Sequence, residues 1–341
     1  MKKVLFSLLV MSSFAFASAR TQADDVKVET VVDGLTNPCG VVMHPKTKAI
    51  YVADSGAGRI CVIKDGKAVP VITDFPIDIY GKGPKYNIGP LGMAFIDDNH
   101  MVVGGGGLKD GEELLRLYKL PADGKSIKAS EMVDSKNLPP TDDIKGEGNF
   151  YALAVVGDKV YASANGDDTK GWLAMATVKD GKFAEFKRGI ATKEAVEVDA
   201  PVGLTVDPKK GYLVVGQMGE ITIPEDGLLS FYSAKDGKLL ANFEVGLSDI
   251  TSVAYNATTY QMYALDFAWH DTKQGGLFHM TKTQDEKSGK SGAKATKVVS
   301  LDKPTAMVID KDGNAYVTLI GTAEGDKPGG KLVKIKLPAI E

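Results

Sequence analysis

The fold is decided by residues 50–67, which read IYVADSGAGRICVIKDGK. Two apolar runs, Ile50–Ala53 and Arg59–Ile63, are four or five residues long and rich in Val, Ile and Tyr, as β-strands are. Asp65-Gly66 follows the second run. An Asp-Gly pair between apolar runs is a strong hairpin signal because both central residues of the turn take positive φ. The stretch therefore predicts short antiparallel strands joined by tight turns.

This turn recurs along the chain at intervals of 56–58 residues, as Asp123-Gly124, Asp180-Gly181 and Asp236-Gly237. A second repeat is an apolar run that contains a small residue and is followed closely by another apolar run. Internal repeats of about this length are typical of propellers. The second repeat occurs six times, and its small residues are Gly40, Gly92, Ala152, Gly203, Ser252 and Ala306.

Six ordered copies of a unit of four short strands predict an all-β, six-bladed β-propeller. The last unit has no room for an outer strand after Lys331–Ile335. We expect Val26–Val32, near the N-terminus, to supply that strand, which closes the ring and removes exposed strand edges. Lys187–Val198 is the best candidate for a short helix in an otherwise all-strand chain.

The composition narrows the possible partners. The chain has 38 glycines among 341 residues, which fits a protein with many tight turns. Lys and Arg number 41 against 44 Asp and Glu, and only four of the basic residues are arginine. Nucleic-acid binding favours a basic excess and arginine forks, so we expect no nucleic-acid partner. No segment is apolar for long enough to span a membrane.

The first 19 residues have the pattern of a secretory signal peptide. Lys2 and Lys3 precede the apolar run Val4–Val10, and Ala17-Ser18-Ala19 forms a small-residue cleavage site. We expect cleavage after Ala19, one propeller domain over 20–341, a periplasmic or extracellular location, and a monomer.

Two cysteines, Cys39 and Cys61, remain in that oxidising compartment. Cys39 precedes the first strand of the first blade, and Cys61 lies on its third strand. Two strand spacings, roughly 9–10 Å, exceed the reach of an unstrained disulfide. We therefore predict free, buried thiols.

The first unit, from Pro38-Cys39-Gly40-Val41 through Ile50–Val62, resembles the NHL-repeat propellers. More broadly, the chain is similar to the six-bladed group of gluconolactonases, senescence-marker-type lactonases and strictosidine-synthase-like proteins. This group contains scaffolds, binding modules and metal-dependent hydrolases, so the resemblance implies the fold and leaves the function open.

The candidate site lies on the face of the ring where loops of unequal length join the second and third strands, because variable loops on a rigid scaffold are where binding usually occurs. Asn37, Asn149 and Asp249 each stand three positions before a small residue of the repeat, with Glu147 and Asp199 nearby in sequence. Their oxygens could surround the mouth of the central channel and hold a hard cation such as Ca²⁺. The lactonase resemblance implies such a metal set, here Glu147, Asn149, Asp199 and Asp249. The metal-binding glutamate that begins the first inner strand of those enzymes is missing from Asn37-Pro38-Cys39-Gly40.

Other candidates have alternative structural roles. Asp54 and Asp266 end matching second strands, where capping of the adjacent turn is the favoured interpretation. The loop Trp269-His270-Asp271 carries more potentially functional side chains than the others, and His270 is its candidate base or ligand. Aromatic side chains could form the walls of the same mouth, or they could cover the seams between blades. These aromatic residues are Tyr80, Tyr86, Phe150, Tyr151 and Trp172.

Two functions follow from these residues. In the first, the exported propeller binds a small molecule or a protein partner through its variable-loop face without catalysis, using Asn37, Asn149, Tyr151, Asp199, Asp249, Trp269 and His270. In the second, it is a metal-dependent, lactonase-like hydrolase. The sequence lacks a Gly-x-Ser-x-Gly elbow, a His-Glu-x-x-His pair and a Walker loop. The first interpretation is favoured because no complete catalytic set is present.

Overall fold

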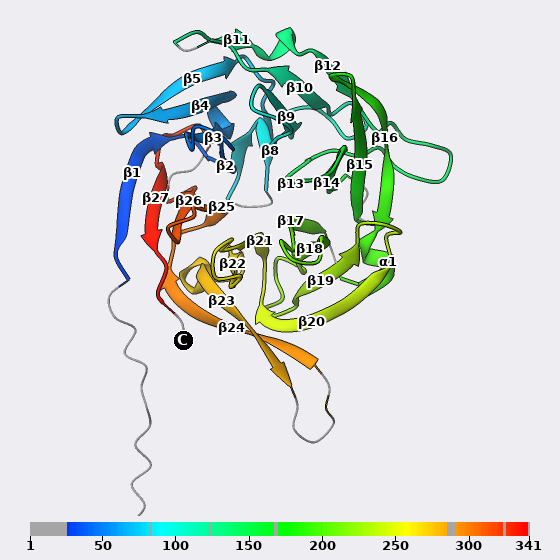
Figure 1. The fold of residues 1–341 in the computed structure, drawn as a ribbon, viewed down its shortest axis with the longest axis vertical. Helices are drawn as coiled ribbons and strands as arrows, with labels where there is room; N and C mark the ends of the chain where they lie inside the picture. Colours follow the sequence, from blue (N-terminus) through cyan, green and yellow to red (C-terminus); the bar gives the residue numbers. More distant parts are fainter. Residues whose placement is uncertain are drawn as a thin grey trace, which may run out of the picture.

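The computed structural model describes residues 26–81, 84–122, 124–166, 170–198, 200–284, 289, 291–322 and 325–339. The predicted signal peptide (1–19) and Asp199 lie outside these ranges. The described part of the chain forms a six-bladed β-propeller, with its blades arranged in a ring around a central channel (Figure 1). It contains no helix long and apolar enough to cross a membrane.

In each blade, antiparallel neighbours run from an inner strand at the channel to an outer strand at the rim. The central strands are apolar along most of their length, as in Met101–Val103 and Leu213–Val215, because successive side chains point to opposite faces and each blade packs on a neighbour on both sides. The strands of blades 1–3 are β2 (Gly40–Met43), β3 (Ile50–Asp54), β4 (Arg59–Lys64) and β5 (Lys67–Thr73); β8 (Pro90–Phe95), β9 (His100–Gly105), β10 (Leu115–Lys119) and β12 (Asp134–Lys136); and β13 (Leu153–Val156), β14 (Lys159–Ala164), β15 (Trp172–Lys179) and β16 (Lys182–Ala191).

Blade 6 takes its outer strand from the N-terminal end of the described chain. β1 (Val28–Leu35) pairs antiparallel with β27 (Gly330–Lys336), with Val28 opposite Ile335, and lies beside it in Figure 1. The strands of blades 4–6 are β17 (Pro201–Val206), β18 (Tyr212–Gln217), β19 (Gly227–Ser233) and β20 (Leu239–Leu247); β21 (Ile250–Tyr255), β22 (Met262–Asp266), β23 (Gly276–Gln284) and β24 (Ser291–Ser300); and β25 (Pro304–Ile309), β26 (Asn314–Leu319), β27 (Gly330–Lys336) and β1.

Two segments differ from the regular pattern. After the turn at Gly124, the chain first adds a short strand to blade 1 and only then returns to blade 2 as β12. This short strand, β11 (Ile127–Lys128), pairs in parallel with β5, and the hydroxyl of Tyr118 donates to the carbonyl of Ala129 beside it at 2.8 Å. The helix expected over 187–198 is only α1 (Thr192–Val196). The preceding residues continue β16, because pairing with β15 satisfies their backbone groups.

The core consists mainly of apolar layers between adjacent blades. Six clusters of buried side chains each join two neighbouring blades around the ring. Leu265 and Met307, for example, pack in the seam between blades 5 and 6. Burial of these layers is the main stabilising contribution to the ring. Cys39 and Cys61 are also buried, and both are free thiols.

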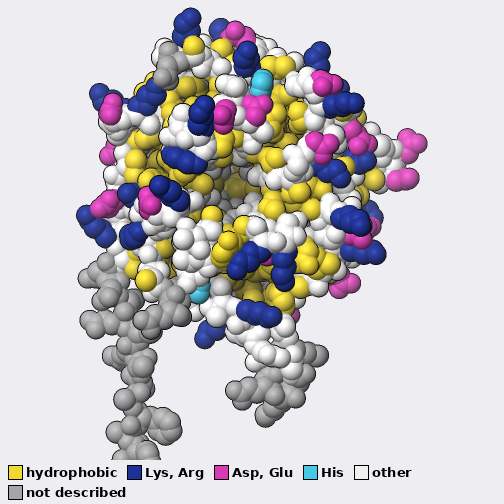
Figure 2. Space-filling model, viewed as in Figure 1, with side chains coloured by type: hydrophobic (Ala, Val, Ile, Leu, Met, Phe, Trp, Pro, Cys, Tyr) yellow, Lys and Arg dark blue, Asp and Glu magenta, His cyan; other side chains and the backbone are white. Residues whose placement is uncertain are grey.

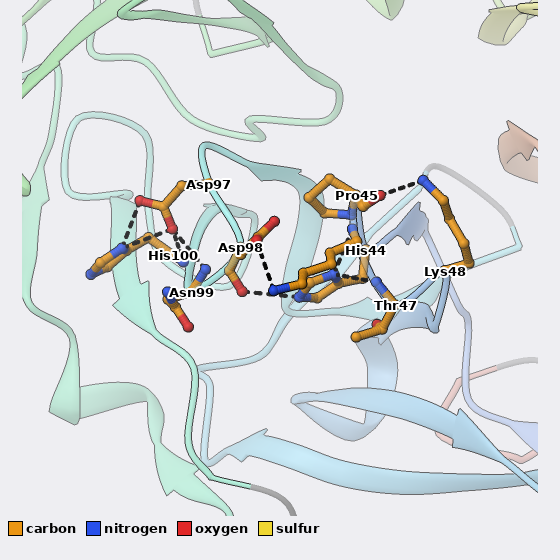
Figure 3. Close-up of polar contacts among 9 residues, drawn as sticks. His44, Pro45, Thr47, Lys48, Asp97, Asp98, Asn99 and His100 are labelled. Carbon is orange, nitrogen blue, oxygen red and sulfur yellow. Dashed lines mark hydrogen bonds and ion pairs between the residues drawn. The ribbon is translucent and has the colours of Figure 1, made fainter.

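Short turns join the first and second strands at the opposite end of the channel from the variable loops. The imidazole of His44 links two of them (Figure 3): its Nε2 donates to the carbonyl of Asp98 in blade 2 at 2.9 Å. Its Nδ1 accepts from the backbone N–H groups of Lys46 and Thr47, and these bonds assign the tautomer. The turn face is therefore held by structural hydrogen bonds.

Candidate functional site

Tyr151 reaches across the central channel and lies between a cavity at each end. Its hydroxyl donates to the carbonyl of Thr305, at 3.1 Å, between blades 3 and 6. Burial raises the pKa of Tyr151 well above its ordinary value, so the hydroxyl stays protonated and can donate. Cys39, Tyr151 and Thr251 line both cavities. The two ends of the channel therefore carry separate cavities.

At the turn end, the channel is a cavity of about 310 Å³ lined by the inner strands β2, β8, β13, β17, β21 and β25. Seen down the axis of the ring, the side chains leave a central hollow with apolar groups around it (Figure 2). Small residues of the repeat, such as Gly40 and Gly92, lie against the backbone of the neighbouring inner segment. A Cβ at Gly40 would lie 2.2 Å from the carbonyl oxygen of Leu91, so the inner strands can approach closely only with glycine there.

At the loop end lies a cavity of about 70 Å³, which we call the aromatic pocket. The ring of Trp269 lies 4.5 Å from Phe267, 5.9 Å from Tyr86 and 6.5 Å from Tyr80, measured between centroids. Asn149 and Asn165 supply amide groups on the side of blade 3. A small apolar cavity with few polar groups is the common form of a ligand site.

A two-stranded hairpin covers one side of the aromatic pocket. β6 (Asp78–Tyr80) pairs with β7 (Tyr86–Ile88) in the connection between blades 1 and 2. Tyr86 and Ile88 are buried, whereas β6 is exposed. A second cavity of about 290 Å³ adjoins the aromatic pocket and shares Tyr80, Ile88 and Asn149 with it. Tyr80 therefore stands between the two cavities, and together they reach the size of an ordinary ligand site.

Asp249 lies behind the wall of the aromatic pocket, at the start of β21. Its Oδ2 accepts from the backbone N–H of Trp269 at 2.6 Å, whereas its buried Oδ1 has no hydrogen-bond partner in the described chain. Burial raises the pKa of Asp249 to about 7, the charges of Asp266 and Asp226 add to the rise, and the bond from Trp269 opposes it. A carboxyl that is half ionised near neutral pH suits proton transfer.

Asp54 and Asp266 both accept backbone N–H groups, but only Asp266 caps the turn that follows its strand, as predicted; the side chain of Asp54 makes no capping bond to its adjacent turn. Asp54 accepts from the N–H of Thr36 at 2.6 Å and binds Arg59 at 2.7 Å. Asp266 accepts from three backbone N–H groups, including that of Asp249 at 2.8 Å. Each carboxylate thus orders the chain that enters the neighbouring inner strand, and Asp266 positions Asp249.

The other predicted site residues lie in different surroundings. Asn149 and Tyr151 line the aromatic pocket together with Trp269. The amide of Asn37 donates to the carbonyls of Asn87 and Gly325, so it joins loops. Nδ1 of His270 is buried and has no hydrogen-bond partner among the described residues, and the ring is not part of the pocket wall.

Of the expected aromatic wall, Tyr80, Tyr86 and Tyr151 line the aromatic pocket. Phe150 instead packs on Phe186, a residue of the outer strand of blade 3, with ring centroids 5.4 Å apart. Trp172 packs in the same cluster. Phe150 and Trp172 therefore have a structural role, because they cover the interior of blade 3.

The described residues do not fit the four-ligand metal set. Glu147 is fully buried and pairs with Arg188 of the outer strand β16 at 3.4 Å. Asp199 lies outside the described ranges. Within those ranges, no three His, Cys, Asp or Glu side chains come together as a metal-binding group. Of the two described carboxylates in this set, Glu147 is engaged by Arg188, and Asp249 has one oxygen without a partner in the described chain.

Three residues near the site were not among the sequence candidates. Asn165 lines the aromatic pocket, and Gln217 and Asp226 have buried side-chain atoms that lack partners in the described structure. Gln217 ends the second strand of blade 4 and pairs with Pro201, just as Asp266 pairs with Ile250 in blade 5. The polar residue at this repeat position was a signal that could have identified Gln217.

Comparison with known proteins relates this geometry to a fold. No protein-family model and no curated protein matches the sequence. A protein assigned as a glucose dehydrogenase-type oxidoreductase from Thermus thermophilus matches with a TM-score of 0.61 at 15% identity, over 91% of this chain and 99% of its own. A gluconolactonase from Xanthomonas campestris matches with a TM-score of 0.55 at 12% identity, over 92% of this chain and 90% of its own.

The chain has the six-bladed fold of the gluconolactonase-like and glucose dehydrogenase propellers. A further structure assigned as a gluconolactonase, with a TM-score of 0.54 at 13% identity, covers 92% of both chains. The predicted similarity to the six-bladed gluconolactonase group is therefore confirmed for the fold, over nearly the whole chain. At these identities the likeness concerns the fold, and the chemistry has to be argued from the residues of the site.

Proposed function

We propose that the protein binds a small cyclic ester at the loop end of the channel and hydrolyses it in the manner of a lactonase, with Asp249 as general base. The observation that carries this proposal is the buried Asp249, which has one free oxygen and a pKa of about 7 directly behind the pocket wall. The gluconolactonases among the structural neighbours support a hydrolytic reaction on this fold.

In this reaction, water attacks the ester carbonyl carbon while Asp249 takes one of its protons. The ring C–O bond then breaks, and the proton passes from the carboxyl to the departing oxygen, which leaves a hydroxy acid. The carboxyl acts through water because Trp269 separates it from the aromatic pocket. Trp269 and the tyrosines beside it favour a substrate with an apolar or aromatic ring.

The test is a hydrolysis assay with dihydrocoumarin, δ-valerolactone and glucono-δ-lactone. We expect the aromatic lactone to be the best substrate, and its rate to rise with pH through about 7, because a general base works when deprotonated. Asp249→Asn should lower kcat by about 100-fold or more. Asp271→Asn is the matched control, since this residue of the same loop caps a turn outside the pocket and should retain activity.

Binding without catalysis is the second candidate, favoured by the enclosure of Asp249 and by the absence of an assembled metal set among the described residues. Dihydrocoumarin would then quench Trp269 fluorescence without being hydrolysed above the buffer rate. That result, obtained with folded protein, would reject the hydrolase proposal. Turnover that persists in Asp249→Asn would reject the role of this carboxyl.

We also propose that the protein is exported to the periplasm or the exterior, on the basis of Lys2-Lys3, the apolar run Val4–Val10 and the small residues at 17–19. Mass spectrometry of protein recovered from these fractions should show a mature chain that begins at Arg20. Full-length protein retained in the cytoplasm would contradict export.

A further inference from the structure

Polar side chains beside the aromatic pocket have buried atoms without partners in the described structure. Gln217 is 0% exposed, and neither its Nε2 nor its Oε1 is hydrogen-bonded to a described group. One carboxylate oxygen each of Asp226 and Asp249 is in the same state. Buried polar groups are nearly always satisfied, by protein or by ordered water, because an unpaired one costs its full desolvation.

The backbone brings these residues to one place between blades 4 and 5. Met218, which follows Gln217, forms a β-bridge with Asp249. The N–H of Gly219 donates to the carbonyl of Ser248 at 3.2 Å. Gly227 lies so close that a Cβ there would meet the carbonyl oxygens of Ser248 and Gln217. The loop that carries Gln217 and Asp226 is thus packed against the start of β21.

Gln217 does not bind backbone N–H groups of the described chain as Asp266, the residue at the same repeat position in blade 5, does. Asp266, at the same repeat position, accepts three backbone N–H bonds. The side chain of Gln217 makes none within the described chain, although it is fully buried. No described group of the protein offsets the desolvation of this buried amide, which leaves bound solvent as a candidate partner.

A water molecule has the matching chemistry. It can accept a hydrogen bond from Nε2 of Gln217 and donate to Oδ1 of Asp249 and to a second acceptor, Oε1 of Gln217 or Oδ1 of Asp226. Buried waters commonly make about three such bonds to otherwise unsatisfied groups. Met218 and Trp269, the neighbours of this cluster, line the aromatic pocket, so the water site adjoins the space where a substrate would lie.

We propose that Gln217, Asp226 and Asp249 hold a buried water between blades 4 and 5, and that Gln217 is the positioning residue that directs this water to Asp249. The role of the water as nucleophile rests on the proposed hydrolysis, whereas the existence of the water site does not. In the reaction, the oxygen of this water bonds to the ester carbonyl carbon while one of its protons passes to Oδ1 of Asp249.

The first test compares Gln217→Met with Gln274→Met, a control on an exposed turn of the pocket loop. Met matches the length of Gln without its amide. We expect Gln217→Met to lower kcat on dihydrocoumarin about 10-fold or more with little change in KM, while its thermal midpoint stays level or rises. The control should change neither quantity. A purely structural Gln217 would give the opposite result, a lower midpoint with unchanged kcat.

The second test is a high-resolution crystal structure of the full-length protein without ligand. We expect an ordered water within hydrogen-bonding distance of the Gln217 amide and of Oδ1 of Asp249, and its loss in Gln217→Met. A dry cluster, or a protein group such as the Asp199 side chain bonded to Gln217, would overturn the proposal. If the wild type hydrolyses none of the three lactones, the hydrolase proposal fails, and this structure still decides the water site.

Discussion

Replacing Asp249 with asparagine should stabilise the protein at alkaline pH even though it removes the proposed base. Burial raises the pKa of Asp249 from 3.8 to about 7, so the folded state holds this proton more tightly than the unfolded chain does. The stability that this proton contributes is complete below about pH 4 and is lost as pH rises through about 7. A difference of about 3 pKa units corresponds to about 4 kcal/mol.

Asparagine has the size of the neutral acid and can still accept from the N–H of Trp269. Urea unfolding of wild type and Asp249→Asn should therefore give nearly equal free energies at pH 4. Relative to wild type, the free energy of unfolding of the variant should increase by about 1.4 kcal/mol per pH unit between about pH 4 and 7. At pH 8 it should exceed the wild-type value by about 4 kcal/mol. Asp271→Asn serves as the control. A variant that is equally stable to wild type at every pH would show that Asp249 is not perturbed by burial.

Three further substitutions test the scaffold by urea unfolding. Glu113→Ala should cost about 3–5 kcal/mol, because it leaves Arg116, only 3% exposed, without its buried partner at 3.1 Å; a cost under about 1 kcal/mol would contradict this. Tyr151→Phe should cost about 1 kcal/mol by removing the bond to Thr305 across the channel, and an unchanged midpoint would show that this bond contributes nothing. His44→Ala should cost about 2–4 kcal/mol, since it removes three hydrogen bonds and the ring contact with Phe95, whose centroid lies 4.8 Å from that of the imidazole. A neutral effect would mean that other contacts hold the turns of blades 1 and 2 together.

Much of the fold could be predicted because its determinants are local and repeated. Asp-Gly turns and short apolar runs specify hairpins, and six copies of them leave few architectures. The exceptions arose where a tertiary partner competed with the local pattern. The segment after Gly124 pairs with β5 of the preceding blade, and the first part of the expected helix, up to Ala191, pairs with β15, since in each case a strand edge was available to satisfy the backbone.

The site could be predicted only in its location. Asn149, Tyr151 and Trp269 line the aromatic pocket, as residues of the variable-loop face were expected to do. Asn37 and Glu147 have equally suitable side chains, and the structure commits them to backbone carbonyls and to Arg188. Their partners are far away in sequence, so spacing along the chain carries no signal for these contacts.

The sequence by itself determined the all-β class, the number of blades and the face on which the loops collect, because turn chemistry and strand periodicity act over a few residues. Tertiary structure alone decided that Tyr151 lies across the channel, that aromatic rings line its loop end, and that Asp249 and Gln217 are buried with polar atoms that no described group pairs. Burial and hydrogen-bond pairing depend on segments from different blades meeting in space. It is this burial that raises the pKa of Asp249.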